Sequence, residues 1–417
     1  MNTSAQTTLT TEDFQQVRDV TEKLAAPLSP EDQQIQSMPD VSPTKWHRAH
    51  VTWFFETFLL KPKLADYTPF DEDFEFLFNS YYEGVGDRHA RDQRGLISRP
   101  SAAQITEYRR HVDEGMHRLI AQADDETSEL IVLGLHHEQQ HQELLLMDIK
   151  HVLASNPTHP RYHSLDEALD ITEVAALKWH GLDGGLVEIG HEGEGFHYDN
   201  EGPRHRVFLE PFQISDRLVT NGEWLEFMAD DGYHDHRHWL SAGWGTVNTQ
   251  GWEAPLYWEP TASGWQMQTL HGFEPVEPTE PVTHVSFFEA DAFARWAGAR
   301  LPTECEWEHA ATTLNPDATS NLTTGRFHPR RADAGDGLRQ LFGEVWQWTS
   351  SSYSAYPGFR TAAGAVGEYN GKFMADQYVL RGSCTATPLG HARTTYRNFF
   401  PSDSRWIFSG LRLANDA

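Results

Sequence analysis

The sequence predicts an α+β chain of two domains, a bundle of four helices followed by a domain of mixed helices and strands. Its 417 residues are too many for one hydrophobic core, because single cores stop growing at about 250–300 residues. Hydrophobic residues make up 39 % and charged residues 23 %, which excludes a largely disordered chain. A 3.6-residue period runs through the first part and then gives way to short apolar runs. We therefore expect one domain at residues 1–165 and another at 166–417.

The first domain is expected to be helical because four segments combine the helical period with start and stop signals. These segments are residues 11–26, 42–62, 101–119 and 127–154. Ser42 is expected to cap the second helix and Pro43 to occupy its first turn. Between the second and third helices lies the long segment 66–99, and connections of that length in compact domains are usually functional.

The second domain is expected to follow a polar stretch at residues 156–173. Helix starts are predicted at Thr220, Ser286 and Thr303, and the last two are followed three residues later by glutamate, which completes a capping box. Apolar runs bounded by turn residues predict strands at 206–214, 344–348, 378–382 and 408–413. This half therefore combines helices and strands with much irregular loop.

Charge and apolar content exclude several classes of partner. Lys and Arg number 33 and Asp and Glu 61, so the formal charge is −28 and polyanions such as nucleic acid would be repelled. No apolar run approaches the ~18 residues that span a bilayer. The chain has two cysteines, and its N-terminus lacks a basic stretch followed by an apolar core. We expect a cytoplasmic protein whose partners include neither nucleic acid nor membrane.

Three histidines form a candidate metal site in the helical domain. His137 and His141 are four residues apart, so on a helix their side chains share one face, about 5–6 Å apart at Cβ. His50 lies on the inward stripe of the second helix, with His47 as an alternative, and bundle cores commonly bind metals through facing helices. Three imidazoles suit either zinc hydroxide chemistry or an iron that binds oxygen and a thiolate together, and spacing does not distinguish the two.

A zinc hydrolase is the first alternative, because residues 137–141 read His-Glu-Gln-Gln-His and match a zinc-protease pattern with Glu138 as general base. The longer metzincin form would need a glycine and a third histidine, whereas residues 142–146 read Gln-Glu-Leu-Leu-Leu. A more distant acidic ligand such as Glu167 would be required instead. A non-catalytic binding module is the second alternative, but such a module would not need three inward histidines.

Four motifs occur together along nearly the whole chain, at residues 46–50, 78–83, 137–141 and 408–413. Together they resemble the ergothioneine-biosynthesis sulfoxide synthases of the EgtB type. The first half is similar to a DinB-like four-helix bundle. The second half resembles the formylglycine-generating-enzyme fold, a C-type-lectin-like architecture, in residues 204–207, 219–221, 301–308 and 343–348.

The resemblance implies an iron(II)- and O2-dependent oxygenase with His50, His137 and His141 as iron ligands. The implied reaction joins a thiol sulfur to C2 of the imidazole of hercynine, which is Nα-trimethylhistidine, and oxidises that sulfur to a sulfoxide. Holding both substrates and oxygen in one oriented complex replaces an improbable three-body encounter. A nearby phenol can donate a proton or hydrogen atom to oxygen, and the resemblance implies Tyr81 and Tyr82 in that catalytic role.

Further implied residues contact hercynine. Gln140 corresponds to a family glutamine that contacts this substrate, and Asn398 is expected to do likewise. Phe399 and Phe400 follow Asn398, and aromatic faces attract a trimethylammonium group through cation–π interaction. The resemblance thus implies that the second domain supplies a wall of the substrate pocket.

The thiol substrate is expected to be L-cysteine. Arg91 and Arg94 match a family arginine pair that holds the carboxylate of the thiol, although Arg88 could replace either in the alignment. The branch that uses γ-glutamylcysteine has Trp-Asp where this chain has Phe399 and Phe400, and its catalytic tyrosine lies in the C-terminal domain. Losing that aspartate removes a partner for the glutamyl amine, which favours L-cysteine as the thiol. The alternative thiol is γ-glutamylcysteine.

Overall fold

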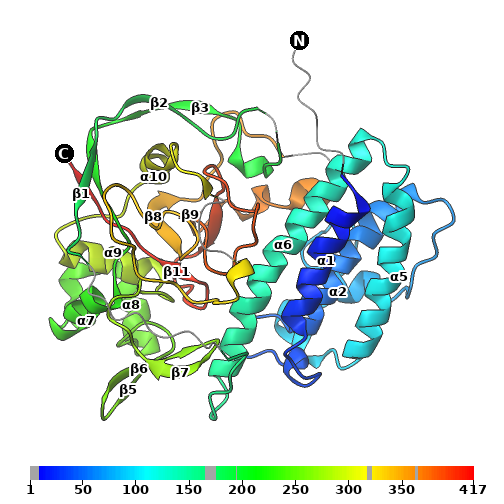
Figure 1. Cartoon of the computed structure of the whole chain (residues 1–417), viewed down its shortest axis with the longest axis horizontal. Helices are drawn as coiled ribbons and strands as arrows, with labels where there is room; N and C mark the ends of the chain where they lie inside the picture. The colour runs from blue at the N-terminus through cyan, green and yellow to red at the C-terminus, as the bar shows by residue number, and fades with distance from the viewer. Residues whose placement is uncertain (1–8, 165–174, 194, 317–321, 362–364) are drawn as a thin grey trace. The chain divides into compact units, whose positions relative to one another are not determined.

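The computed structural model describes residues 9–164, 175–193, 195–316, 322–361 and 365–417. The chain divides into two compact units, Met1–Asn156 and Pro157–Ala417. Unit 1 is blue to teal in Figure 1 and unit 2 is green to red. The domain boundary predicted between residues 165 and 166 lies outside the described residues, as does Glu167.

Unit 1 is a helical bundle in which α2 packs against α5 and α6, and α1 packs against α6 (Figure 1). The four predicted helices are confirmed. Capping boxes at Thr10 and Ser101 begin α1 and α5, and the side chain of Asp124 caps α6. The main helices are α1 (Thr11–Ala25), α2 (Thr44–Phe55), α5 (Ala102–Ile120) and α6 (Asp125–Ala154). Shorter pieces are η1 (Asp32–Gln34), the π-helix η2 (Glu56–Leu60), α3 (Lys61–Lys63), α4 (Phe74–Phe78) and the 3-10 helix η3 (Arg91–Leu96).

The predicted cap of the second helix is wrong. Pro43 is the N-cap residue of α2 and makes no side-chain cap bond. The hydroxyl of Ser42 instead accepts a hydrogen bond from Arg94 at 2.9 Å, and its backbone N–H donates to Asp148 at 2.8 Å. These tertiary contacts occupy the groups that a local cap would have used.

The long segment between α2 and α5 is organised around Asn79. This fully buried side chain donates hydrogen bonds to the carbonyls of Tyr82 and Gly86, at 3.0 and 3.1 Å, and accepts one from the N–H of Tyr82 at 3.1 Å. Side-chain amides often substitute for backbone partners in such turns. The turn fixes the backbone at Tyr82 and thus the direction of its side chain.

Unit 2 contains four small sheets among its described residues, with strand orders β1-β4-β12, β10-β9-β8-β11, β2-β3 and β5-β6-β7. The first six strands are β1 (Trp179–Leu182), β2 (Gly185–Ile189), β3 (His205–Leu209), β4 (Phe212–Ser215), β5 (Trp258–Thr261) and β6 (Gly264–Thr269). The others are β7 (Gly272–Pro275), β8 (Trp346–Ser352), β9 (Gln377–Gly382), β10 (Asn398–Pro401), β11 (Ser409–Gly410) and β12 (Ala414–Asp416). Strand β10 pairs antiparallel with β9, with Asn398 opposite Leu380.

The helices of unit 2 confirm the predicted starts. Thr220, Ser286 and Thr303 each form a capping box, and they begin α7, α9 and α10. Helix α8 was not predicted, since Gly243 and Gly245 weaken its helical pattern. The α-helices are α7 (Asn221–Ala229), α8 (Ser241–Gln250), α9 (Phe287–Trp296) and α10 (Glu304–Ala311). Short 3-10 helices are η4 (Asp199–Glu201), η5 (His236–His238), η7 (Leu322–Thr324), η8 (Ala365–Glu368) and η9 (Gly371–Phe373).

One predicted strand is divided in the structure and another is shortened. Residues 206–214 form the end of β3 and most of β4, which are separated around Pro211, a residue without an N–H to donate. Residues 408–413 contain β11, while the carbonyls of Leu411 and Leu413 accept from Val219 and Ser215. Within the described ranges, no helix has the length and apolar character needed to cross a membrane.

Candidate metal centre

The three histidines singled out in the sequence lie together in unit 1. His50 comes from α2, and His137 and His141 come from successive turns of α6. One ring nitrogen of each lies within 4.8 Å of those of the other two. His50 and His137 are buried and His141 is half-buried, so water competes little for these nitrogens. Among the residues that the structure describes, this cluster has the donor set and spacing of a metal site.

The ring of His50 is held so that Nε2 is available as a ligand. Its Nδ1 donates a hydrogen bond to the carbonyl of Phe78 at 2.7 Å, which leaves the lone pair on Nε2. Trp46 stacks on the imidazole with centroids 4.6 Å apart and planes at 13°, and Trp53 stacks at 5.5 Å and 19°. Nε2 is buried and has no hydrogen-bond partner, an expensive state for a nitrogen that binds nothing. The residues present therefore fit a bound metal ion.

His141 is supported from behind by a second histidine. Its Nδ1 lies 2.9 Å from Nδ1 of His47, and Nε2 of His47 lies 2.9 Å from Oδ2 of Asp148. Both nitrogens of His47 are thus engaged in hydrogen bonds. This arrangement favours His50 over His47 as the third ligand.

The imidazoles of the cluster are held in their neutral form. Burial is the largest cause, and it lowers the pKa of His137 to about 3 and places those of His50 and His141 well below their usual range. For His50 and His141 the neighbouring His137 lowers the pKa further. A metal binds the deprotonated nitrogen, so a neutral cluster need not release protons first.

Glu138, the base of the zinc-protease reading, is fully buried in a polar network. Its Oε2 accepts from Arg18 at 2.7 Å, and its Oε1 accepts from Arg109 at 2.9 Å and from the Thr21 hydroxyl at 2.6 Å. Burial is the largest influence and raises its pKa, but attraction to Arg18 and Arg109 outweighs burial, so the net pKa is lowered. A general base needs an available oxygen and a pKa near the working pH, and Glu138 has neither.

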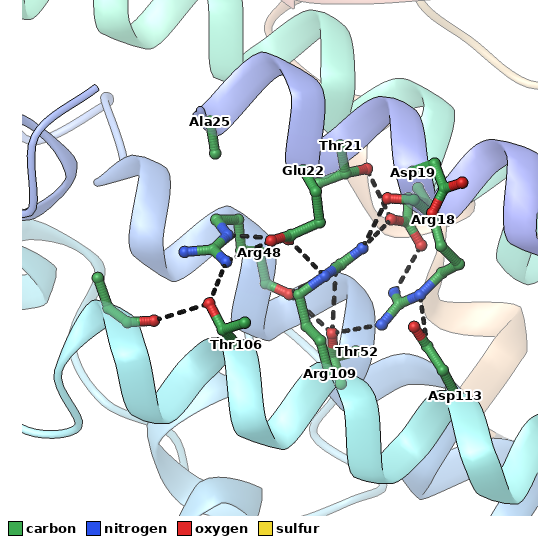
Figure 2. A network of polar contacts seen from close by, with 12 residues as sticks. Arg18, Asp19, Thr21, Glu22, Ala25, Arg48, Thr52, Thr106, Arg109 and Asp113 are labelled. Carbon is green, nitrogen blue, oxygen red and sulfur yellow. Dashed lines mark hydrogen bonds and ion pairs between the residues drawn. The ribbon is translucent and has the colours of Figure 1, made fainter. Parts of the chain in front are cut away.

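This network, shown in Figure 2, continues through the bundle and was not anticipated from the sequence. Arg18 also bonds Asp113 at 2.8 Å, and Glu22 pairs with Arg109 at 2.7 Å and with Arg48 at 2.6 Å. A signal was present, because Arg18 lies four residues after the buried Phe14 on the inward face of α1. A charged residue on an apolar stripe indicates a buried partner.

The two predicted catalytic tyrosines differ in burial. Tyr82 is fully buried, and its ring packs 5.6 Å from Trp53 and 5.1 Å from Phe58 between centroids. Tyr81 is half-buried and stacks on Tyr82 at 4.6 Å. Since Trp53 also stacks on His50, a single indole ring connects Tyr82 to the histidine cluster.

The predicted arginine pair is divided between the interior and the surface. Arg94 is 5 % exposed, its guanidinium carbon lies 3.4 Å from the centroid of Trp46, and its Nε has no hydrogen-bond partner. Arg91 is exposed and donates to a backbone carbonyl at 2.7 Å, and Arg88 pairs with a loop glutamate. Arg94 is therefore the arginine beside the aromatic rings that pack on His50.

The predicted contacts to hercynine lie in both units. Gln140 is half-buried on α6, whereas Asn398, Phe399 and Phe400 lie on β10. Successive strand residues face opposite sides, so Asn398 and Phe400 share one face. Phe399 points the other way and stacks on Tyr353, with centroids 4.0 Å apart and planes at 8°. The strand thus favours Phe400 over Phe399 as the companion of Asn398.

Family models match both units. The DinB superfamily matches residues 13–163, and the sulfatase-modifying factor enzyme 1-like domain matches residues 179–417. The order of a DinB domain and a sulfatase-modifying-factor domain confirms the fold class expected from the sequence.

Three bacterial proteins resemble the chain over more than half of its length. The hercynine oxygenase of Mycobacterium tuberculosis is 32 % identical over 404 residues, which cover 91 % of this chain and 92 % of that protein. The hercynine oxygenase of Mycolicibacterium thermoresistibile is 31 % identical over 417 aligned residues, which cover 91 % of this chain and 88 % of that protein. The formylglycine-generating enzyme of Streptomyces coelicolor is 30 % identical over a region that covers 57 % of this chain and 88 % of that protein. With both domain families in order and this identity over 91 % of its length, the chain belongs to the hercynine oxygenase family, the EgtB-type sulfoxide synthases of the ergothioneine pathway.

Proposed function

We propose that His50, His137 and His141 bind iron(II), and that the protein joins the sulfur of L-cysteine to C2 of the hercynine imidazole to give hercynylcysteine sulfoxide. The observation that carries this proposal is the cluster of neutral imidazoles, in which the buried Nε2 of His50 has no hydrogen-bond partner. Three imidazoles leave positions open on an octahedral ion. Iron(II) bound there would supply the activation of O2 as co-substrate.

Residues around the cluster provide binding and a proton. Arg94 is proposed to hold the carboxylate of cysteine, since its buried guanidinium has an unused Nε donor and the N–H groups along its planar edge match a carboxylate. Tyr82 is proposed to donate its phenolic proton during the reduction of oxygen. Its side chain is fully buried, so bulk water does not contact the phenol.

Hercynine is proposed to bind through Gln140, Asn398 and the aromatic residues beside Asn398. An amide can hydrogen-bond the imidazole or the carboxylate of this substrate, and an aromatic face attracts its trimethylammonium group.

The choice of L-cysteine over γ-glutamylcysteine is supported by composition at β10. The γ-glutamyl amine is a cation and needs a carboxylate or another acceptor. Phe399 and Phe400 supply neither. Free cysteine has no γ-glutamyl group, so only its own carboxylate and amine need partners. Arg91 remains proposed as a weaker contact to this carboxylate, because it is exposed to solvent.

The test is a reaction of the full chain under controlled metal and oxygen. Protein loaded anaerobically with iron(II) is mixed with hercynine and cysteine, exposed to air, and followed by mass spectrometry for hercynylcysteine sulfoxide. A zinc-loaded sample and the variant His50→Gln should give none, whereas His136→Gln, a change at a neighbouring α6 histidine, should retain the product. Preference for γ-glutamylcysteine would overturn the thiol assignment alone, and equal turnover with zinc would overturn the iron assignment.

A further inference from the structure

The hydrogen bonds behind His141 form a directed chain that ends on a buried carboxylate. Asp148 is 4 % exposed, and its Oδ2 accepts from the backbone N–H of Ser42 at 2.8 Å and lies 2.9 Å from Nε2 of His47. Because a carboxylate can only accept, Nε2 of His47 carries the hydrogen of that bond. In the neutral form of the imidazole, the other nitrogen of His47 is then an acceptor.

This direction determines which nitrogen of His141 is protonated. Nδ1 of His141 lies 2.9 Å from the acceptor Nδ1 of His47, so the hydrogen of His141 is on Nδ1 and its lone pair is on Nε2. His50 reaches the same tautomer by another route, since its Nδ1 donates to the carbonyl of Phe78 at 2.7 Å. Two members of the cluster thus direct Nε2 towards a shared ion.

We infer that His47 and Asp148 are positioning residues that fix the tautomer and ring orientation of His141 and strengthen it as a ligand. The inference rests on the proposed metal site. Partners of this kind orient a ligating imidazole and increase its basicity, and losing one typically costs about 10–100-fold in metal affinity. The carboxylate acts through His47 because the imidazole of His47 lies between Asp148 and His141.

Asp148 is an unsuitable first target, because it also receives the Ser42 N–H next to the start of α2, and its loss would disturb the helix. Two substitutions of His47 separate its two bonds. In His47→Asn the amide oxygen replaces Nδ1 as acceptor for His141. In His47→Gln the longer side chain places its amide near Asp148 and leaves Nδ1 of His141 without its acceptor. Both variants remove the imidazole, so a purely structural role of the ring would affect them equally.

The measurement is metal affinity of the full chain, by anaerobic titration with iron(II) and with cobalt(II), whose visible spectrum reports ligand geometry. His47→Gln should lose about 10–100-fold in affinity and show an altered cobalt spectrum. His47→Asn should lose less, because it keeps the acceptor for His141 and loses only the bond to Asp148. His328→Asn is the matched control. It removes another buried histidine–carboxylate contact, 2.8 Å from His328 Nε2 to Glu280 in unit 2, and should bind both metals as wild type does.

Each outcome decides the inference. The predicted difference between His47→Asn and His47→Gln would support it. An equal loss of metal affinity in both variants would assign His47 a structural role, and wild-type affinity in both would leave it no role. Either result overturns the inference while the metal site stands. A wild-type chain that binds neither metal would overturn the metal site and the inference together.

Discussion

The guanidinium carbon of Arg94 lies 3.4 Å from the centre of the Trp46 ring, and the same indole stacks on His50 at 4.6 Å. Arg94 also donates to the Ser42 hydroxyl, and the Ser42 N–H donates to Asp148 behind His47. One buried cation is thus connected to the surroundings of two histidines of the cluster. A thiol substrate held by Arg94 would therefore be placed by the same contacts that orient these histidines.

Replacing Arg94 by lysine should weaken binding of cysteine. Lysine keeps the charge but loses the planar group that stacks on Trp46 and forms paired bonds to a carboxylate. We expect the KM for cysteine to rise about 10–100-fold, equivalent to about 1.4–2.8 kcal/mol, while the KM for hercynine changes little. Steady-state kinetics with each substrate varied would show this. The exposed Arg91→Lys is the control, and an equal rise in both variants would contradict the assignment to Arg94.

Tyr82→Phe should divert oxidation away from the carbon–sulfur bond. Removing a positioned proton donor typically costs about 10²–10⁴-fold, so cysteine should leave mainly as its sulfinic acid. The phenylalanine retains the packing against Trp53, which makes a folding defect an inadequate explanation. Tyr81→Phe, at the half-buried neighbour, should retain more of the sulfoxide product. The ratio of sulfoxide to sulfinic acid is measured by mass spectrometry, and unchanged ratios in both variants would remove the tyrosines from the mechanism.

Arg109→Met should destabilise unit 1 far more than Arg110→Met. Arg109 is 3 % exposed and binds the fully buried Glu138, and leaving that carboxylate without one of its two arginines should cost about 3–5 kcal/mol. The melting temperature should fall by roughly 6–20 °C. Arg110 forms an exposed ion pair with Glu114 at 3.2 Å, and its loss should cost under about 1 kcal/mol. Similar melting temperatures by calorimetry would show that the network contributes little.

Glu344→Gln should remove a pH-dependent contribution to the stability of unit 2. Burial is the largest cause that raises the pKa of Glu344 to about 8, and its Oε2 accepts from the Arg330 N–H at 2.6 Å. A carboxyl with a raised pKa retains its proton when folded. Its stabilisation is present below its ordinary pKa of about 4.5 and is lost as pH rises towards 8.

The wild-type melting temperature should therefore fall between pH 6 and pH 8, while that of Glu344→Gln stays nearly constant and exceeds it at pH 8. The difference at pH 8 should be about 1–3 kcal/mol. Glutamine keeps an acceptor for Arg330. The exposed Glu210→Gln should melt as wild type does at both pH values, and parallel pH profiles for wild type and Glu344→Gln would contradict the prediction.

Local patterns were sufficient to predict most of the helices and the pair His137 and His141. The spacing of His137 and His141 requires only a helix, whereas the pattern of α2 left His47 as an alternative to His50, and the resemblance implied His50. Capping boxes at Ser101, Ser286 and Thr303 are likewise contained within a few residues. Such features depend on contacts three or four residues apart, which the sequence displays directly.

Contacts between distant segments were not predictable in the same way. His47 and Asp148 are separated by 101 positions, and nothing local indicates that Asp148 receives both His47 and the Ser42 N–H. The cap assigned to Ser42 failed because a tertiary partner, Arg94, uses its hydroxyl. Pairing on β10 likewise depends on β9, a strand some twenty residues earlier. Only the structure therefore showed that Asn398 and Phe400 lie on one face of β10 and Phe399 on the other.

All three histidines of the cluster, together with His47 and Asp148, belong to unit 1, whereas Asn398 and its aromatic neighbours belong to unit 2. Some of the residues proposed to bind the substrate thus lie in a different unit from the residues proposed to bind the metal. If these proposals hold, mutations in the second half of the gene would alter which imidazole or thiol is accepted while the donor set stays intact. Substrate preference would then be able to diverge between lineages without passing through a metal-free intermediate.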